Sequence, residues 1–272
     1  DVGNTTIEIG IIKDHKISIS WRLQTDQGRL ADEYGVQICQ LLRSRSISAS
    51  EFEGAIISSV VPSVGRELSK MCQRFFYHCP LKVSEELDLG IRLLVEQPEE
   101  IGADRLATAV GAYHTYKMPL IVVDFGTATT YDAISPDGDY LGGAITPGIG
   151  ITMNALFDHA ALLRRVDLTA PKSIIGTNTS ECIKSGFYFG FRYQMEGIID
   201  QMKSELIQRC RLGNKSEVQV VATGGLVDLI AEGSKIVDHI NSNLLLKGLG
   251  IIYHRHQNYF YLIIYYLNLN LN

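Results

Sequence analysis

The chain has 272 residues, of which 46% are hydrophobic and 20% charged, and its formal net charge is −5. These values are typical of a folded globular protein and leave room for two domains. The negative charge, without a basic stripe, zinc finger or aromatic RNA-binding pattern, argues against a nucleic-acid partner. The five cysteines form no C-x-x-C pair, which argues against a zinc site and favours reduced thiols in the cytoplasm.

The first part of the chain has the order strand, strand, helix, strand, helix. The predicted elements are strands over Ile7–Ile12 and Lys16–Leu23 around an Asp14–His15 turn, a helix over Tyr34–Arg43, a strand over Ala55–Val61, a helix after Pro62, and a weak strand over Leu81–Val83. We expect Ser63 to cap the helix after Pro62, with Glu67 near its first turn. A further helix runs from Asp104 to about Tyr116 and is ended by Pro119.

The second part begins at Leu120 and alternates strands with helices. Strands are predicted over Leu120–Asp124, Thr129–Ile134, Tyr140–Thr146, Val218–Ala222 and Ile236–Val237, and helices over Ile149–His159, Glu181–Arg209, Leu226–Glu232 and Leu244–Tyr253. Asp137-Gly138 is a strong hairpin turn between two of these strands.

The last residues, His256–Asn272, consist almost wholly of Tyr, Leu, Ile and Asn and are read as a low-complexity extension. Their longest apolar run, Tyr259–Leu267, is shorter than the about 20 residues that a membrane helix needs, so we expect no membrane segment. The sequence is therefore divided into two domains, 1–117 and 118–255, and a tail, 256–272.

The stretch LIVVDFGTATTY, from Leu120 to Tyr131, carries the strongest chemical signal. Its first four residues predict a strand buried on both faces, which ends at Asp124 beside Gly126 and the hydroxyls of Thr127, Thr129 and Thr130. Glycine lets backbone N–H groups approach a phosphate, and a carboxylate holds the cation or its waters. The alternative interpretation is a tight hairpin with an Asx-type turn.

The opening DVGNTTIEIGIIKD repeats this pattern at a constant offset of 123, so that Asp1 matches Asp124 and Gly3 matches Gly126. Two related halves, each with an Asp-x-Gly turn, suit a polyphosphate bound from both sides. A third glycine turn, Thr223–Gly225, also follows a predicted strand. By the same match a buried strand should precede Asp1, and we expect this strand and an initiator Met to be missing from the start.

Gly102-Ala103-Asp104-Arg105 is the remaining polar cluster. A carboxylate such as Asp104 can accept the proton of a substrate hydroxyl during phosphoryl transfer, and the guanidinium of Arg105 can bind a carboxylate. The alternative makes Asp104 a helix N-cap and Arg105 a member of a surface ion pair.

Six motifs in this order, DVGNTT, GADR, DFGTATT, GGAITPG, IGTNT and ATGG, resemble those of type III pantothenate kinases. The resemblance covers Asp1 to Arg255 and places the chain in the acetate and sugar kinase/Hsp70/actin superfamily. It implies an α/β fold of two similar ribonuclease H-like domains with a nucleotide cleft between them. It also implies transfer of the ATP γ-phosphate to the primary hydroxyl of pantothenate, the first step of coenzyme A biosynthesis, by a cytoplasmic homodimer.

The resemblance also assigns residue roles. Asp104 would accept the proton, Asp124 would bind a monovalent cation, K⁺ or NH4⁺, and Asp1 would lie near Mg²⁺. ATP would contact Asp1, Val2, Gly3, Asn4, Thr5, Thr6, Ile7, Glu8 and Thr127. Pantothenate would contact Val95, Gly102, Ala103, Asp104, Arg105 and Thr179. Val95 departs from the pattern, because many members of the family carry a tyrosine there.

Two other functions remain open at this point. One is a kinase of another small hydroxy compound, which substrate screening at fixed ATP would separate. The other is a catalytically silent nucleotide-binding regulator of the same fold. Such a regulator would be expected to lose Asp104, Arg105 or Asp124, whereas this chain retains all three.

Overall fold

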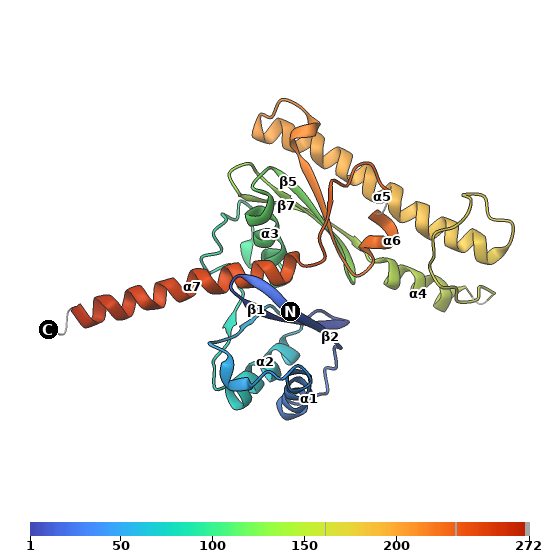
Figure 1. Ribbon diagram of the computed structural model, residues 1–272. Helices are drawn as coiled ribbons and strands as arrows, with labels where there is room; N and C mark the ends of the chain where they lie inside the picture. The colour runs from blue at the N-terminus through green and yellow to red at the C-terminus, as the bar shows by residue number, and fades with distance from the viewer. Residues whose placement is uncertain (161, 232, 270–272) are drawn as a thin grey trace. The chain divides into compact units, whose positions relative to one another are not determined.

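The computed structural model describes residues 1–160, 162–231 and 233–269. The fold is α/β, as predicted, and the chain forms two compact units (Figure 1). The first unit comprises Asp1–Ile91, Glu96–Gly111 and the chain from Leu245 onward, and the second comprises Arg92–Val95 and Ala112–Leu244. Among the described residues, no helix has both the length and the apolar character needed to cross a bilayer.

A five-stranded sheet in the order β7-β6-β5-β8-β9 forms the centre of the second unit. Its strands are β5 (Leu120–Phe125), β6 (Ala128–Ile134), β7 (Tyr140–Pro147), β8 (Gln219–Gly224) and β9 (His239–Ile240). Strand β5 pairs antiparallel with β6 and parallel with β8. All four residues of Leu120–Val123 are buried, which confirms the interpretation of this run as a central strand.

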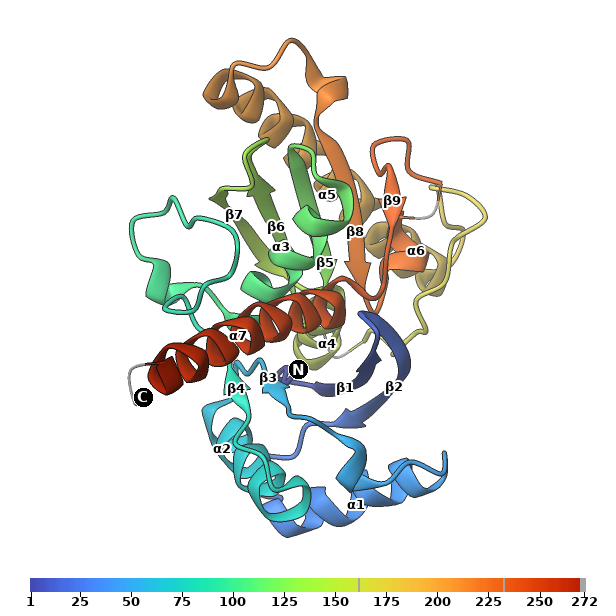
Figure 2. The same cartoon turned by 60° about the vertical axis from the view of Figure 1, so that its left-hand side comes forward.

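Helix α5 (Thr179–Cys210) lies along one face of this sheet (Figure 2). Its residues Met195, Ile199 and Leu206 join the sheet residues Ile121 and Val123 in one hydrophobic core. Helices α4 (Ile149–His159) and α6 (Val227–Ala231) contribute to the same core. Helix α3 (Ala103–Tyr116) carries the chain from the first unit into the second.

The first unit contains two separate two-stranded sheets. Strands β1 (Thr6–Lys13) and β2 (Lys16–Gln24) form the predicted antiparallel hairpin, with positive φ at both turn residues, Asp14 and His15. Strands β3 (Ile56–Ile57) and β4 (Leu81–Lys82) are short and parallel.

The helices of the first unit are α1 (Ala31–Arg43), α2 (Pro62–Met71) and α7, which begins at the boundary and spans Leu244–Leu269. Short helical turns occupy Ala49–Glu51, Cys72–Phe76, Pro98–Glu100 and, in the second unit, Lys215–Glu217.

The structure corrects several local predictions. Helix α7 does not end at Tyr253 but continues to Leu269, because no glycine or proline interrupts the chain after Gly250. The last short strand forms at His239–Ile240, where the ladder with β8 begins, and not at Ile236–Val237. The remaining tail residues, 270–272, lie outside the described residues.

The third correction concerns the start of α2. Val61 is its N-cap, without a side-chain cap hydrogen bond, and Pro62 is its first residue, so Ser63 is not the cap. Strand β3 is correspondingly shorter than the predicted Ala55–Val61.

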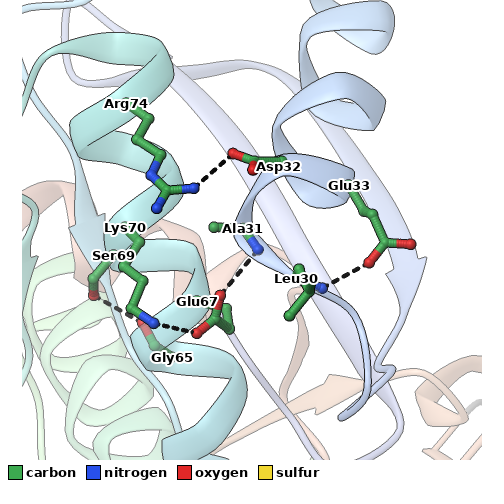
Figure 3. A network of polar contacts seen from close by, with 9 residues as sticks. All are labelled: Leu30, Ala31, Asp32, Glu33, Gly65, Glu67, Ser69, Lys70 and Arg74. Atoms are coloured by element: carbon green, nitrogen blue, oxygen red, sulfur yellow. Dashed lines mark hydrogen bonds and ion pairs between the residues drawn. The ribbon is translucent and has the colours of Figure 1, made fainter.

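Glu67 has a different role from the one expected, because it stabilises the start of another helix (Figure 3). Its Oε2 accepts a hydrogen bond from the backbone N–H of Ala31, at 3.0 Å, and its Oε1 accepts one from Lys70 Nζ at 2.6 Å. The hydrogen bond from Lys70 and then the one from Ala31 lower the pKa of this carboxyl. A carboxylate on α2 thus satisfies a free N–H at the N-terminus of α1, where negative charge is favourable.

We predict that Glu67→Ala lowers the melting temperature by roughly 2–4 °C, because Ala31 N–H loses its acceptor. Lys70→Ala is the matched control: it removes only an ion pair and should leave the melting temperature nearly unchanged. Thermal unfolding followed by circular dichroism measures both. Equal shifts in the two variants would contradict a capping role for Glu67.

Candidate functional site

Asp124 lies at the end of β5, where it pairs with Thr130 of β6 and Thr223 of β8. The next residue of β8, Gly224, has a φ of +98°, which side-chain-bearing residues rarely adopt. A Cβ atom at Gly224 would lie 2.5 Å from Asp124 Oδ1 and 2.5 Å from Phe125 N. Only glycine therefore lets the end of β8 come this close to the carboxylate.

A second glycine, Gly148, makes a similarly close backbone contact in the same region. The N–H of Gly148, in the loop after β7, donates to Thr127 C=O at 3.1 Å. A Cβ on Gly148 would lie 2.6 Å from Gly126 O, again too close for any other residue. Gly126 itself donates its N–H to Ala128 C=O at 3.1 Å. Glycines from three separate motifs thus shape the end of β5, and such bare backbone is what a phosphate group needs for close contact.

Thr129 adds a polar atom to this region. Its side chain is 1% exposed, and within the described residues its Oγ1 is buried without a hydrogen-bond partner. A buried hydroxyl left unsatisfied costs about 1–3 kcal/mol. The strand register places Thr129 opposite Phe125 and Asp124 opposite Thr130, so the Thr129 hydroxyl lies on the other face of the sheet from the Asp124 carboxylate.

In the first unit, the Asp1 turn is held by hydrogen bonds of its own. Asp1 Oδ1 accepts from the hydroxyl of Ser58 at 2.8 Å. Gly3 N–H donates to Thr6 C=O at 3.0 Å, and the Thr25 hydroxyl donates to Gly3 C=O at 2.7 Å. The turn is therefore fixed through its backbone.

The predicted ATP-binding residues of this turn divide into two kinds. Asn4, Thr5 and Thr6 are exposed, so their side chains are accessible to a ligand. Val2 and Ile7 are buried in the hydrophobic core, so a ligand can reach only their backbone. Glu8 and Gly3 are half-buried.

The GADR motif lies at the start of α3. Asp104 is the second helical residue, and its Oδ1 accepts a hydrogen bond from Arg105 N–H at 2.8 Å. It is therefore not an N-cap, which was the alternative interpretation. A Cβ on Gly102 would lie 2.5 Å from Asp104 Oδ1 and 3.5 Å from Val60 Cγ1.

The closeness of Gly102 to Val60 connects the GADR motif to the Asp1 turn. Val60 N–H donates to Val2 C=O at 3.1 Å. The first unit thus brings Gly102 and Asp104 to the strand end that carries Asp1 and Val2. Two of the motifs identified in the sequence are therefore neighbours in the fold.

The other predicted site residues lie in the second unit. Val95 is half-buried and comes within 3.6 Å of the position that a Cβ on Gly142 would occupy. Thr179 is the exposed first residue of α5, next to the cap residue Asn178, whose Oδ1 accepts from Glu181 N–H at 3.0 Å. Thr127 is half-buried in the turn between β5 and β6.

The sequence analysis did not single out two residues of these strand ends, Ser58 and Thr129. The hydrogen bond from the Ser58 hydroxyl to Asp1 gave no local signal, because Ser58 is one of two serines in a mainly apolar predicted strand. Thr129 was noted only as one hydroxyl of a row, and its burial depends on strand pairing. The ATGG and GGAITPG motifs did indicate Gly224 and Gly148.

Comparison with known protein families identifies the family of this chain. Residues 1–201 match the type III pantothenate kinase family. The chain belongs to this family. It is thus an ATP-dependent pantothenate kinase, as its motifs indicated.

Solved structures resemble the kinase over nearly its full length. A protein assigned to the Baf family of transcriptional activators, from Campylobacter jejuni, is 19% identical with a TM-score of 0.53, covering 94% of this chain and 97% of its own. The activator of 2-hydroxyisocaproyl-CoA dehydratase from Clostridium difficile, solved with ADPNP, is 11% identical with a TM-score of 0.48, covering 93% and 91%. At 19% identity, the first likeness supports the fold alone.

We predict that Gly224→Ala lowers kinase activity by about 10²-fold, because the added Cβ displaces the Asp124 carboxylate. Gly225→Ala is the matched control, since a Cβ at Gly225 meets no atom within 4 Å. Steady-state ADP release with pantothenate measures both variants. Full activity of Gly224→Ala would contradict the role of this close approach.

Proposed function

We propose that Asp104 is the general base of this pantothenate kinase. As the primary hydroxyl oxygen of pantothenate forms a bond to the γ-phosphorus of ATP, the bond from that phosphorus to the β,γ-bridging oxygen breaks and ADP leaves. The hydroxyl proton passes to the Asp104 carboxylate, and the product is 4'-phosphopantothenate. The observation that supports this proposal is the position of Asp104 Oδ1, which lies 2.5 Å from where a Cβ on Gly102 would be, next to Val60 and the strand end that carries Asp1.

We propose that the Asp1–Glu8 turn and Thr127 bind the phosphates of ATP. The exposed side chains of Asn4, Thr5 and Thr6 supply hydrogen-bond donors, and Val2 and Ile7 contribute only backbone groups. The carboxylate of Asp1 would orient waters of the Mg²⁺ that accompanies the nucleotide, since Mg²⁺ keeps several waters when it is bound with phosphates.

Asp124 is proposed to bind a monovalent cation, K⁺ or NH4⁺. Its carboxylate lies beside the bare backbone of Gly224. When bound, the cation would supply positive charge next to the transferring phosphoryl group.

Pantothenate would bind through the remaining residues of the family motifs. The guanidinium of Arg105 suits the substrate carboxylate, because its planar fork matches two carboxylate oxygens. Gly102, Ala103, Thr179 and Val95 would line the rest of the molecule. Valine at position 95 is smaller than the tyrosine of many relatives and cannot donate a hydrogen bond, so it encloses the substrate less completely.

We also propose that the kinase is a cytoplasmic homodimer. The second unit exposes large apolar side chains before and along α5, among them Leu162, Ile174, Ile175 and Tyr193. Exposed apolar groups of this size commonly mark protein interfaces. Thr179 belongs to the same stretch, so a partner subunit here would lie close to this substrate residue.

The sequence repeat supports a further proposal, that the halves 1–117 and 118–255 are duplicates of one domain type. Asp1 and Asp124 each begin an Asp-x-Gly turn that leads into an antiparallel strand, β1 or β6.

We predict that Asp104→Asn lowers kcat by about 10²–10⁴-fold while ATP binding is retained, since the amide cannot accept the proton. Glu99→Gln, which changes an exposed carboxylate in the preceding turn, is the control and should retain activity. Coupled ADP release with pantothenate gives kcat, and calorimetry gives the affinity for ATP. Turnover of Asp104→Asn at the rate of the unaltered kinase would remove the base assignment.

We predict that activity requires K⁺ or NH4⁺ and falls at least about 10²-fold in Na⁺ alone, since a cation beside a phosphoryl oxygen stabilises the transition state by several kcal/mol. Asp124→Ala should lose the activity together with its dependence on the cation. The measurement is ADP release at constant ionic strength with each salt in turn. Equal rates in Na⁺ and K⁺ would exclude the proposed cation site.

A further inference from the structure

The short segment Arg92–Val95 belongs to the second unit, whereas the residues before and after it belong to the first. It lies next to the start of β7, the strand at one edge of the five-stranded sheet (Figure 2). Leu93 forms a parallel bridge with Tyr140, the first residue of β7. Tyr140 N–H donates to Arg92 C=O at 2.8 Å, and Leu94 N–H donates to Tyr140 C=O at 2.8 Å. One residue of β7 thus holds the backbone of the segment on both sides of the bridge.

A side-chain ion pair fixes the start of the same segment. Arg92 Nε donates to Asp139 Oδ1 at 2.6 Å, and Arg92 Nη2 donates to Asp139 Oδ2 at 2.8 Å, so the guanidinium binds both carboxylate oxygens. The Asp139 side chain is only 7% exposed, whereas that of Arg92 is 70% exposed. A bidentate pair fixes orientation as well as charge, which most exposed ion pairs do not.

Both residues that hold the segment are themselves held in place. Asp139 N–H donates to Ser135 Oγ at 3.0 Å, and Ser135 N–H donates to Asp139 C=O at 2.9 Å. The hydroxyl of the buried Tyr140 donates to Oδ1 of the buried Asp132 at 2.6 Å. Asp139 and Tyr140 are therefore fixed points on the sheet, and the segment is attached to both.

Val95, the last residue of the segment, is the one for which we propose a contact with pantothenate. Its Cγ1 lies 3.6 Å from the position that a Cβ on Gly142 would occupy. Valine offers only methyl groups, so it holds a ligand by dispersion. A gap of about 0.5–1 Å already loses roughly a quarter to a half of that attraction. The contact therefore depends on where the backbone of the segment is held.

We propose that Arg92 is a positioning residue for pantothenate. Paired with Asp139, it holds the segment Arg92–Val95 against β7 so that Val95 stays in contact with the substrate. Arg92 acts through Val95 and needs no contact of its own with pantothenate. The inference rests on the proposed contact of Val95, and it adds two residues that lie outside the six sequence motifs. A pair that only stabilised the hairpin would leave the affinity for pantothenate unchanged.

Arg92→Ala should raise KM for pantothenate about 10-fold and leave kcat and KM for ATP unchanged, because one lost methyl-sized contact is worth about this much. It should also speed amide hydrogen exchange at Leu94, whose N–H donates to Tyr140. Arg209→Ala is the matched control: it removes another exposed ion pair of the same unit, with Glu205, and should change neither measurement. An unchanged KM or an unchanged exchange rate in Arg92→Ala would overturn the proposal.

The second residue of the pair gives an independent check. Asp139→Asn should raise KM for pantothenate in the same way. The double variant Arg92→Ala/Asp139→Asn should have the KM of Arg92→Ala alone, because both changes break one pair. Arg92→Lys should give an intermediate KM, since an ammonium keeps the charge and loses the fork. Additive effects of the two changes would show that the residues act separately and would overturn the proposal.

Val95→Ala separates this inference from the contact on which it rests. If Val95 touches pantothenate, Val95→Ala raises KM for pantothenate, and adding Arg92→Ala then has little further effect. An unchanged KM in Val95→Ala would overturn the contact itself and the inference with it. A raised KM in Val95→Ala beside an unchanged KM in Arg92→Ala would overturn the inference alone.

Discussion

The close approach of the β8 backbone to the Asp124 carboxylate is the contact on which the candidate site depends. A glycine with a φ of +98° brings the end of β8 within reach of Asp124, and Gly148 brings a second loop against Gly126. Glycine is more flexible than other residues in the unfolded chain, so ordering these positions on folding costs more conformational entropy. Burial of β5 in the sheet offsets that cost. The result is a strand end with a fixed carboxylate and bare backbone. Such a strand end suits the binding of a phosphate and a cation, and it does not depend on which hydroxyl compound accepts the phosphoryl group.

Patterns within a few residues predicted much of the fold. The run Leu120–Val123 indicated a buried strand, and Asp137-Gly138 indicated a turn, because each depends on local propensity. The start of α1 could not be predicted in the same way, because the acceptor for Ala31 N–H is Glu67, 36 residues away in the sequence. The residues of the candidate site were found because each motif is short, whereas Ser58 and Thr129 required the strand pairing.

Helix α7 illustrates most clearly which features of the fold the sequence does not predict. Its sequence predicted a helix from Leu244, but not what the helix packs against. A Cβ on Gly248 would lie 1.8 Å from Ala107 O in α3, and a Cβ on Gly10 would lie 2.9 Å from Leu246 Cδ1. These glycines allow close packing between segments far apart in the chain, and a glycine in the sequence does not reveal its partner.

Amide hydrogen exchange with saturating ATP tests the central claim, that the Asp-x-Gly turns bind the phosphates, most directly. Binding should slow exchange within residues 2–8 and 125–129, because ligand contact stabilises these turns against local opening. The helices α1 and α2 should be unaffected. Bound ATP that leaves both turns exchanging at their original rates would contradict the account.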